Sequence, residues 1–324
     1  IKPVFSDVAS RNEVELSTKL TRNITIDAPW VSAPMDTVSG PEMLHALDEK
    51  GGVGCLHRFY DNMSGKMNEV IGEVSPFVVS MGMDSRFYDW VEAFYLIQSY
   101  VGYTIDAILI DVAHGHHEKM KKIMSHIQEY PMDTDIIAGN VATAEGAVDL
   151  ASWGADAIRL GIGNGSVCTT RMKTGIGVPQ VTAIMQAVDG LRQAGYSDVP
   201  VIADGGVRSP GDIAKALAAG ADSAMIGSLL SGTKEAPGEV KQIDGKKYKR
   251  YEGSASGGED YVEGVKEKVE FKGPVEDVLK NLRDGLRSSF SYVGARDVNE
   301  FRANAELIRV STSGHIEGKP HLKM

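Results

Sequence analysis

The chain contains two cysteines, and only one of them lies where a thiol can do chemistry. Cys168 follows glycines and hydroxyl side chains in a long polar segment, whereas Cys55 lies in an apolar run and is most simply a small buried hydrophobe. A free thiol has a pKa of about 8.5, so a nucleophilic Cys168 would need nearby N–H groups or a cation to lower that pKa. Residue type alone leaves a nucleophilic and an inert Cys168 both open.

A cluster of histidines offers a second kind of chemistry. Asp111 is followed by histidines at positions 114, 116 and 117, and His57 follows another apolar run, so these side chains could ligate a metal ion. A metal-dependent hydrolase on a barrel would normally require paired ligands on its first strand. Residues 32–36 offer only Asp36 there. We therefore favour ordinary structural or binding roles for the histidines over a metal site.

Glycine-rich segments follow several apolar runs and favour a ligand that bears a phosphate, because their backbone N–H groups can bind its oxygens. The pattern at 161–166, Gly-x-Gly-x-Gly-Ser, is not the dinucleotide fingerprint, and no P-loop motif occurs. Asp204, just before two glycines, is placed to accept hydrogen bonds from ribose hydroxyls. Glu263 is either a solvated charge or an acid, and its residue type does not decide which.

The elements that must position these residues are short strands alternating with helices. Apolar runs rich in β-branched residues predict eight strands, at 30–33, 52–56, 77–81, 107–112, 135–138, 157–160, 199–203 and 223–226. Helical spacing predicts helices between most of them, at 88–100, 117–129, 144–153, 181–194 and 210–219. This alternation predicts an α/β fold, a parallel (β/α)8 TIM barrel, whose chemistry lies on the loops after the strands.

Two intervals break the alternation. Residues 160–180 form a long loop that contains Cys168, and loops of this length are usually functional. Residues 232–273 are polar and rich in Gly, Lys and Glu, so we expect a mobile flap over the barrel mouth, followed by a helix at 274–286. We find no linker, so we expect residues 1–324 to form a single catalytic barrel domain.

Composition excludes several classes of protein. The 324 residues include 34 basic and 44 acidic ones, a net charge of -10, which argues against nucleic-acid or acidic-membrane partners. The longest stretch without charge, residues 174–188, is shorter than the roughly 18 residues that suggest a membrane helix. The distant cysteines suggest neither a disulfide scaffold nor a zinc knuckle. We therefore expect a cytoplasmic protein.

Several motifs together resemble the IMP dehydrogenase/GMP reductase family. They are Gly-Ser-Val-Cys-Thr-Thr-Arg at 165–171, Gly-Val-Pro-Gln at 177–180, Met-Asp-Thr-Val at 35–38, Ile-Ala-Gly-Asn-Val at 137–141, Ala-Asp-Gly-Gly at 203–206 and Met-Ile-Gly-Ser at 225–228. The likeness covers nearly the whole chain. It implies a (β/α)8 barrel, a purine nucleotide 5′-monophosphate in the mouth, a nicotinamide cofactor beside it, and a homotetramer.

The resemblance also implies residue roles. Cys168 would attack purine C2, Thr170 would orient the leaving group or water, and Glu263 would contact the purine N1 edge and take part in proton transfer. Asp204 would bind the ribose. The other substrate-binding positions would be Ser166, Gly206, Gly227, Ser228, Tyr251, Gly253 and Met35. The implied cofactor-binding positions are Asp111, Gly161, Arg287 and Ser288. Backbone carbonyls of Gly163, Gly165 and Cys168 would hold a monovalent cation such as K⁺.

Local sequence decides which branch of the family we expect. The segments 10–14, 57–59, 253–256 and 287–294 look like those of GMP reductases, whereas 31–35 and 177–180 are closer to the dehydrogenase. No CBS pair interrupts the connection 59–76, and no Arg-Tyr pair lies between Ser256 and Glu263. We therefore expect NADPH-dependent reduction of GMP, or a related guanine nucleotide, to IMP and ammonia. The alternatives are an IMP dehydrogenase without CBS domains and an inactive nucleotide-binding regulator.

Overall fold

A computed structural model describes residues 1–84, 86–253 and 265–318, and its centre is a closed parallel barrel. The sheet order is β3-β10-β9-β8-β7-β6-β5-β4. These strands are β3 (Trp30–Ser32), β4 (Cys55–Leu56), β5 (Val78–Met81), β6 (Ala107–Asp111), β7 (Asp135–Val141), β8 (Ala157–Leu160), β9 (Val201–Asp204) and β10 (Ser223–Ile226). A parallel bridge between Val31 and Val53 closes the ring. The predicted (β/α)8 barrel is confirmed.

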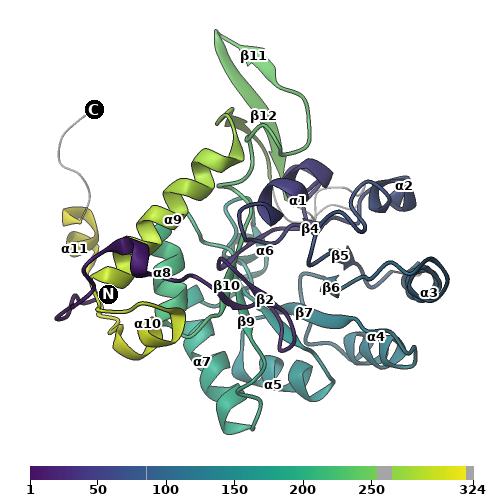
Figure 1. The fold of residues 1–324 in the computed structure, drawn as a ribbon, viewed down its shortest axis with the longest axis horizontal. Coiled ribbons are helices and arrows are strands. Elements are labelled where there is room, and N and C mark those ends of the chain that lie inside the picture. The colour runs from purple at the N-terminus through teal and green to yellow at the C-terminus, as the bar shows by residue number, and fades with distance from the viewer. Residues whose placement is uncertain (85, 254–264, 319–324) are drawn as a thin grey trace.

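Helices form an outer ring around these strands, as Figure 1 shows. Those between consecutive strands are α1 (Pro41–Asp48), α2 (Met63–Met67), α3 (Phe87–Leu96), α4 (Glu118–Gln128), α5 (Ala144–Ser152), α6 (Thr170–Thr174), α7 (Gln180–Gln193) and α8 (Pro210–Ala218). A π-helical turn, Ile97–Val101, extends α3. The later helices are α9 (Val275–Ser291), α10 (Val298–Asn304) and α11 (Thr312–Glu317), and a 3-10 turn spans Arg11–Glu13. Each helix predicted from spacing is present within a few residues.

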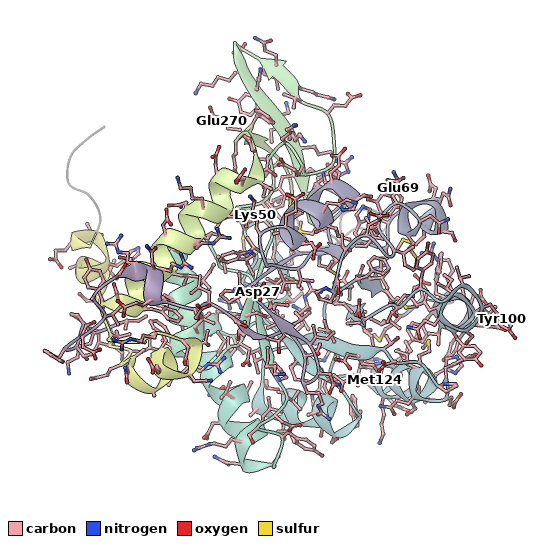
Figure 2. All side chains as sticks on the ribbon, in the orientation of Figure 1. Asp27, Lys50, Glu69, Tyr100, Met124 and Glu270 are labelled. Carbon is pink, nitrogen blue, oxygen red and sulfur yellow. The ribbon has the colours of Figure 1, made fainter. Side chains whose placement is uncertain are left out.

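The barrel strands are mostly apolar because both of their faces are covered, by the barrel interior and by the helices; the charged exceptions include Asp111, Arg159 and Asp204. One apolar cluster surrounds β3, β10 and α9, and a second lies beneath α3, α4, α5 and α7. Met124 on α4 is buried in the second cluster, whereas Tyr100 lies at the outer rim of the molecule (Figure 2). Among the described helices, none is long and apolar enough to cross a membrane.

Two small antiparallel sheets were not predicted from the sequence. The first pairs β1 (Thr18–Lys19) with β2 (Thr25–Ile26). The second lies in the described part of the expected flap and contains β11 (Lys241–Ile243), β12 (Lys246–Glu252) and β13 (Lys266–Glu270). It projects beyond α9 in Figure 1. Asp244 and Gly245, both with positive φ, form the two-residue turn between β11 and β12. Asp-Gly is a strong hairpin signal that sequence analysis could have used.

Candidate active site

A cavity of about 240 Å³ opens at the carboxyl ends of the barrel strands. Asp111 ends β6 and Asp204 ends β9, while Gly161 and Gly227 directly follow β8 and β10. All four lie on the cavity wall because parallel strands bring their carboxyl ends to the same face. The barrel therefore gathers residues that are far apart in sequence around one space.

Most of the residues selected from the sequence line this cavity. They are Met35, Asp111, Gly161, Gly163, Gly165, Ser166, Cys168, Thr170, Asp204, Gly206, Gly227, Ser228, Tyr251 and Gly253. Glu263 lies outside the described residues. Arg287 and Ser288 do not line the cavity: they lie in α9, which packs against α8 on the outside of the barrel. We therefore do not include Arg287 and Ser288 in the site.

The Cys168 thiol lies on the loop between β8 and α6, close to a hydroxyl group. Its Sγ is 3.1 Å from Oγ1 of Thr170, and its backbone N–H donates to the carbonyl oxygen of Gly165 at 3.1 Å. Cys168 is half-buried and faces the cavity. Cys55, in contrast, is fully buried on β4, and burial raises the pKa of its thiol. Only Cys168 of the two thiols can therefore meet a ligand.

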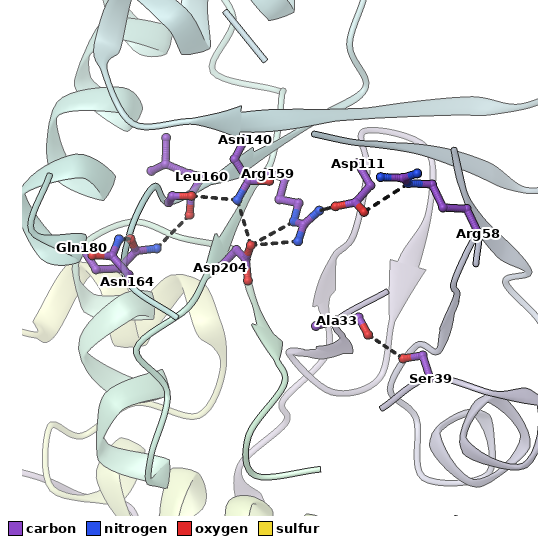
Figure 3. A network of polar contacts seen from close by, with 11 residues as sticks. Ala33, Ser39, Arg58, Asp111, Asn140, Arg159, Leu160, Asn164, Gln180 and Asp204 are labelled. Carbon is purple, nitrogen blue, oxygen red and sulfur yellow. Dashed lines mark hydrogen bonds and ion pairs between the residues drawn. The ribbon is translucent and has the colours of Figure 1, made fainter. Parts of the chain in front are cut away.

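A buried arginine joins two carboxylates across the cavity wall (Figure 3). Arg159, in the middle of β8, donates from Nη1 to Oδ1 of Asp111 at 2.5 Å and from Nε to Oδ2 of Asp204 at 3.0 Å. Burial opposes the charge of Arg159, but Asp204 and Asp111 outweigh it and raise the pKa of the guanidinium. Arg159 was not among the residues predicted from the sequence, although a lone charge inside an otherwise apolar strand was a signal.

Two further side chains extend this network. Asn140, near the end of β7, donates from Nδ2 to the carbonyl oxygen of Gly161 at 2.7 Å and to Oδ2 of Asp204 at 2.8 Å. Arg58, after β4, has its Nε 3.6 Å from Oδ2 of Asp111. Oδ2 of Asp204 is thus held by three nitrogen donors, and both Asp111 and Asp204 line the cavity.

Elsewhere on the cavity wall, a tyrosine supports the loops expected to bind phosphate. The phenol of Tyr251, on β12, lies 3.1 Å from Oγ of Ser166. Burial raises the pKa of Tyr251, and the Ser166 hydroxyl partly offsets this effect. A side chain at Gly227 would come within 3.0 Å of the Tyr251 phenol and 3.3 Å of the Met35 sulfur. Close packing at this point therefore favours glycine after β10.

The Cys168 loop is anchored at both ends by side-chain hydrogen bonds. Asn164 contacts Gln180 and Arg171, and Arg171 also donates to the carbonyl oxygen of Val178. Gln180 in turn donates to the carbonyl oxygen of Leu160 at 2.8 Å. These contacts join the start of the loop to the first residue of α7. These hydrogen bonds consequently constrain the conformation of the Cys168 loop.

The histidine cluster has contacts of its own. His116 lies 2.7 Å from Oδ2 of Asp149, and His117 caps α4 by accepting the N–H of Lys119. His57 is buried, its ring stacks on Tyr60, and burial lowers its pKa to about 4. Within residues 1–84, 86–253 and 265–318, no three His, Cys, Asp or Glu side chains gather in a way that could hold a metal ion.

Nearly the whole chain is similar to known proteins. The model of the IMP dehydrogenase / GMP reductase domain family matches residues 1–76 and 89–321. An inosine-5'-monophosphate dehydrogenase of Nitrosopumilus maritimus is 32% identical over 98% of this chain and 96% of its own length. One of Borreliella burgdorferi is 32% identical over 96% of this chain and 92% of its own. One of Rhodopirellula baltica is 45% identical over 69% of this chain, a match that spans 44% of that relative.

Proposed function

The chain belongs to the IMP dehydrogenase / GMP reductase family, and on this basis we propose that it is an IMP dehydrogenase, which oxidises IMP to XMP with NAD⁺. The observation that carries the proposal is the half-buried Cys168 thiol, 3.1 Å from the Thr170 hydroxyl at the barrel mouth, in a chain similar over nearly its whole length to a protein named for that activity. A nicotinamide cofactor and a purine nucleotide fit the family.

The expectation of a GMP reductase is wrong. The relatives reported above are all named inosine-5'-monophosphate dehydrogenase, and two of them match over more than nine-tenths of this chain. The expectation of NADPH rested on the same branch and falls with it. Similarity of a few short segments to reductases was a weaker argument than a match over nearly the whole chain. The separate flap comparison concerned residues between 256 and 263, which lie outside the described residues.

We assign the chemical step to the Cys168 sulfur. Its thiolate would form a bond to C2 of the hypoxanthine ring, and C2 would then lose a hydride, whose acceptor is the nicotinamide of the bound cofactor. Hydrolysis of the resulting thioimidate would break the S–C2 bond and release XMP and the thiol. Thr170, whose hydroxyl lies beside the sulfur, would orient the water, and we retain Glu263 as the acid at the N1 edge.

IMP and the cofactor would occupy different parts of the cavity. Asp204 would accept from the ribose of IMP, and Ser166, Gly206, Gly227 and Ser228 would hold its phosphate with Tyr251 and Gly253 nearby. Asp111 and Gly161 would face the cofactor. The cavity suits such a group: Nε of Arg58, on its wall beside Asp111, is buried without a hydrogen-bond acceptor among the described residues. That donor could serve a cofactor hydroxyl or phosphate oxygen.

We also propose a single catalytic domain, a homotetramer, and a K⁺ ion bound by the carbonyls of Gly163, Gly165 and Cys168. These three residues lie together on the cavity wall, which supports a cation at the Cys168 loop. Light scattering on the purified protein tests the tetramer. Activity in K⁺ against an equal concentration of Li⁺ tests the ion, and equal rates in the two salts would remove it from the proposal.

The reaction itself is tested by offering both substrate pairs. We expect IMP with NAD⁺ to give sustained XMP and NADH, and GMP with NADPH to give no IMP or ammonia. Products are separated by chromatography, so that loss of cofactor absorbance alone does not decide the outcome. Conversion of GMP with NADPH at a comparable or higher rate would contradict the proposal. The Cys168→Ala variant, which should be inactive, serves as the inactive-enzyme control in both assays.

A further inference from the structure

Arg159 lies in the wall of the cavity, but the proposed function gives it no role in binding either substrate. The side chain comes from the middle of β8, is 7% exposed, and lies between the carboxylates of Asp111 and Asp204, which are 9% and 17% exposed. The two carboxylates come from strands β6 and β9, on either side of β8 and β7. Each uses one oxygen to contact the arginine. The arginine thus joins the two sides of the cavity.

We infer that Arg159 is a positioning residue that holds Asp204 toward the nucleotide ribose and Asp111 toward the cofactor at the same time. The inference rests on the proposed assignment of these two carboxylates to the two substrates. It goes beyond that assignment because it makes both binding sites depend on one buried side chain. Loss of Arg159 should therefore weaken both ligands, although it need not touch either of them.

The geometry of the guanidinium explains why arginine is required. Its planar fork has separate N–H donors, so Nη1 reaches Asp111 while Nε and Nη2 reach Asp204. A lysine would supply the same charge from a single point and could satisfy only one carboxylate well. A neutral side chain would leave two carboxylates in a poorly solvated wall with only Arg58, 3.6 Å from Asp111, to balance them.

Other titratable groups near the pair do not replace this charge. Two of them interact electrostatically with the network: the Cys55 thiol with Arg159, and the Tyr251 phenol with Asp204. Burial raises the pKa of both Cys55 and Tyr251, so each stays neutral below pH 8. Asn140 donates to Asp204 but carries no charge. In a variant without Arg159, like-charge repulsion should raise the pKa of one carboxyl group.

The test measures binding in the Cys168→Ala background, which prevents turnover. Calorimetry gives the dissociation constants of IMP and GMP, and of NAD⁺ at saturating IMP, from pH 5.5 to pH 8. We expect Arg159→Met to raise the dissociation constants of IMP, GMP and NAD⁺ by about 10- to 100-fold at pH 8. As the pH falls to 5.5, the ratio of variant to parent constants should rise by a further factor of several for IMP or for NAD⁺, according to which of the two carboxyl groups takes up the proton.

Taking this ratio cancels the titration of the nucleotide phosphate, which both proteins share. Arg159→Lys should weaken at least one ligand about 10-fold but show no new pH dependence, because the charge remains. Arg302→Met is the matched control: Arg302 donates to Asp222 at 2.7 Å at the start of β10, at the opposite end of the barrel from the site. It should lower the melting temperature and leave both ligands within about twofold of the parent.

Three results would overturn the inference. The first is an Arg159→Met variant that weakens only one ligand, and the second is a variant-to-parent ratio that does not change with pH. The third applies if Arg159→Met fails to fold. The Arg159→Lys variant is then measured instead, and if it binds IMP, GMP and NAD⁺ as tightly as the parent, Arg159 is not a positioning residue. Because IMP and GMP share the same ribose, absence of XMP formation by the wild type would refute the proposed reaction without affecting this binding test.

Discussion

The sulfur of Cys168 lies 3.1 Å from the hydroxyl oxygen of Thr170, two residues further along the chain at the first position of α6. The helix start fixes the hydroxyl, and the hydrogen bond from the Cys168 N–H to Gly165 fixes the turn before it. The thiol and the hydroxyl are therefore held on one wall of the cavity by local backbone structure, independently of any ligand.

Replacing the nucleophile should separate binding from turnover. Cys168→Ala should bind IMP with an affinity close to that of the wild type and form no XMP, because no other thiol faces the cavity. The measurements are calorimetry with IMP and product analysis with NAD⁺. Cys55→Ala is the control and should keep a wild-type kcat. A Cys168→Ala enzyme with substantial kcat would exclude a covalent mechanism through this residue.

The contact between Tyr251 and Ser166 should contribute to nucleotide affinity as a unit. Tyr251→Phe and Ser166→Ala each remove the 3.1 Å hydrogen bond, and each should raise the KM for IMP by about 2- to 10-fold. The double variant should be little worse than either single one, because the shared contact is lost only once. Initial-rate kinetics at saturating NAD⁺ measure this. Fully additive effects would show that the two residues act separately.

Gly161 should tolerate no side chain. Its φ is +144°, and a Cβ there would lie 2.1 Å from the carbonyl oxygen of Asp204. Gly161→Ala should therefore lower the free energy of unfolding by about 3 kcal/mol or more and weaken nucleotide binding. Gly195, with φ +85° and no atom within 4 Å of its Cβ position, is the matched control. Gly195→Ala should cost about 1 kcal/mol and leave the kinetics unchanged. Equal losses in urea denaturation would argue against the predicted clash.

His57 should make the fold less stable in mild acid. Its Nδ1 accepts the N–H of Phe59 at 3.1 Å, and burial lowers its pKa to about 4 from an ordinary value near 6.5. A depressed folded-state pKa means that the stability is fully present above pH 6.5 and is lost as the pH falls toward 4. Between pH 8 and pH 5 the wild type should lose about 2 kcal/mol through this group.

Urea denaturation at the two pH values tests this. His57→Gln should show a correspondingly smaller loss, measured against the wild type so that other titrating groups cancel. The exposed His315 on α11 is the control, and His315→Gln should behave as the wild type does. If His57→Gln and wild type lose stability in parallel, protonation of His57 does not limit the fold in acid.

The barrel strands could be predicted because their signal is local. Strand β8 was expected at 157–160 and is present at Ala157–Leu160, since a strand buried on both faces is mostly apolar and three of its four residues are. The alternation of such runs with helices then placed Cys168 and Asp204 at one mouth. The same local view failed for β11 and β12, because their mostly charged sequence contains no apolar run, even though Lys249, Tyr251 and Glu252 are buried in the fold; only the Asp-Gly turn marked the hairpin.

The centre of the site could not be predicted in this way. Arg159 reaches carboxylates 48 and 45 residues away, and which of them it meets depends on the order of the strands and on the stagger between them. A run of apolar residues with one arginine is equally compatible with a surface charge at the end of a strand. Closure of the barrel turns that side chain inward, and only the complete ring defines its partners.

Closure of the ring also sets the order in which the protein can be completed during its synthesis. Trp30 pairs with Ala224 and Val31 with Met225, so β3 cannot form its pairing with β10 until β10 has been synthesised. At about 5–20 residues per second, a ribosome needs roughly 10–40 s to make the chain between them. Throughout that time one edge of Trp30–Ser32 has no native neighbour, and unpaired edges invite contact with other nascent chains. During synthesis the chain therefore exposes one edge of β3 that is paired with β10 in the folded protein.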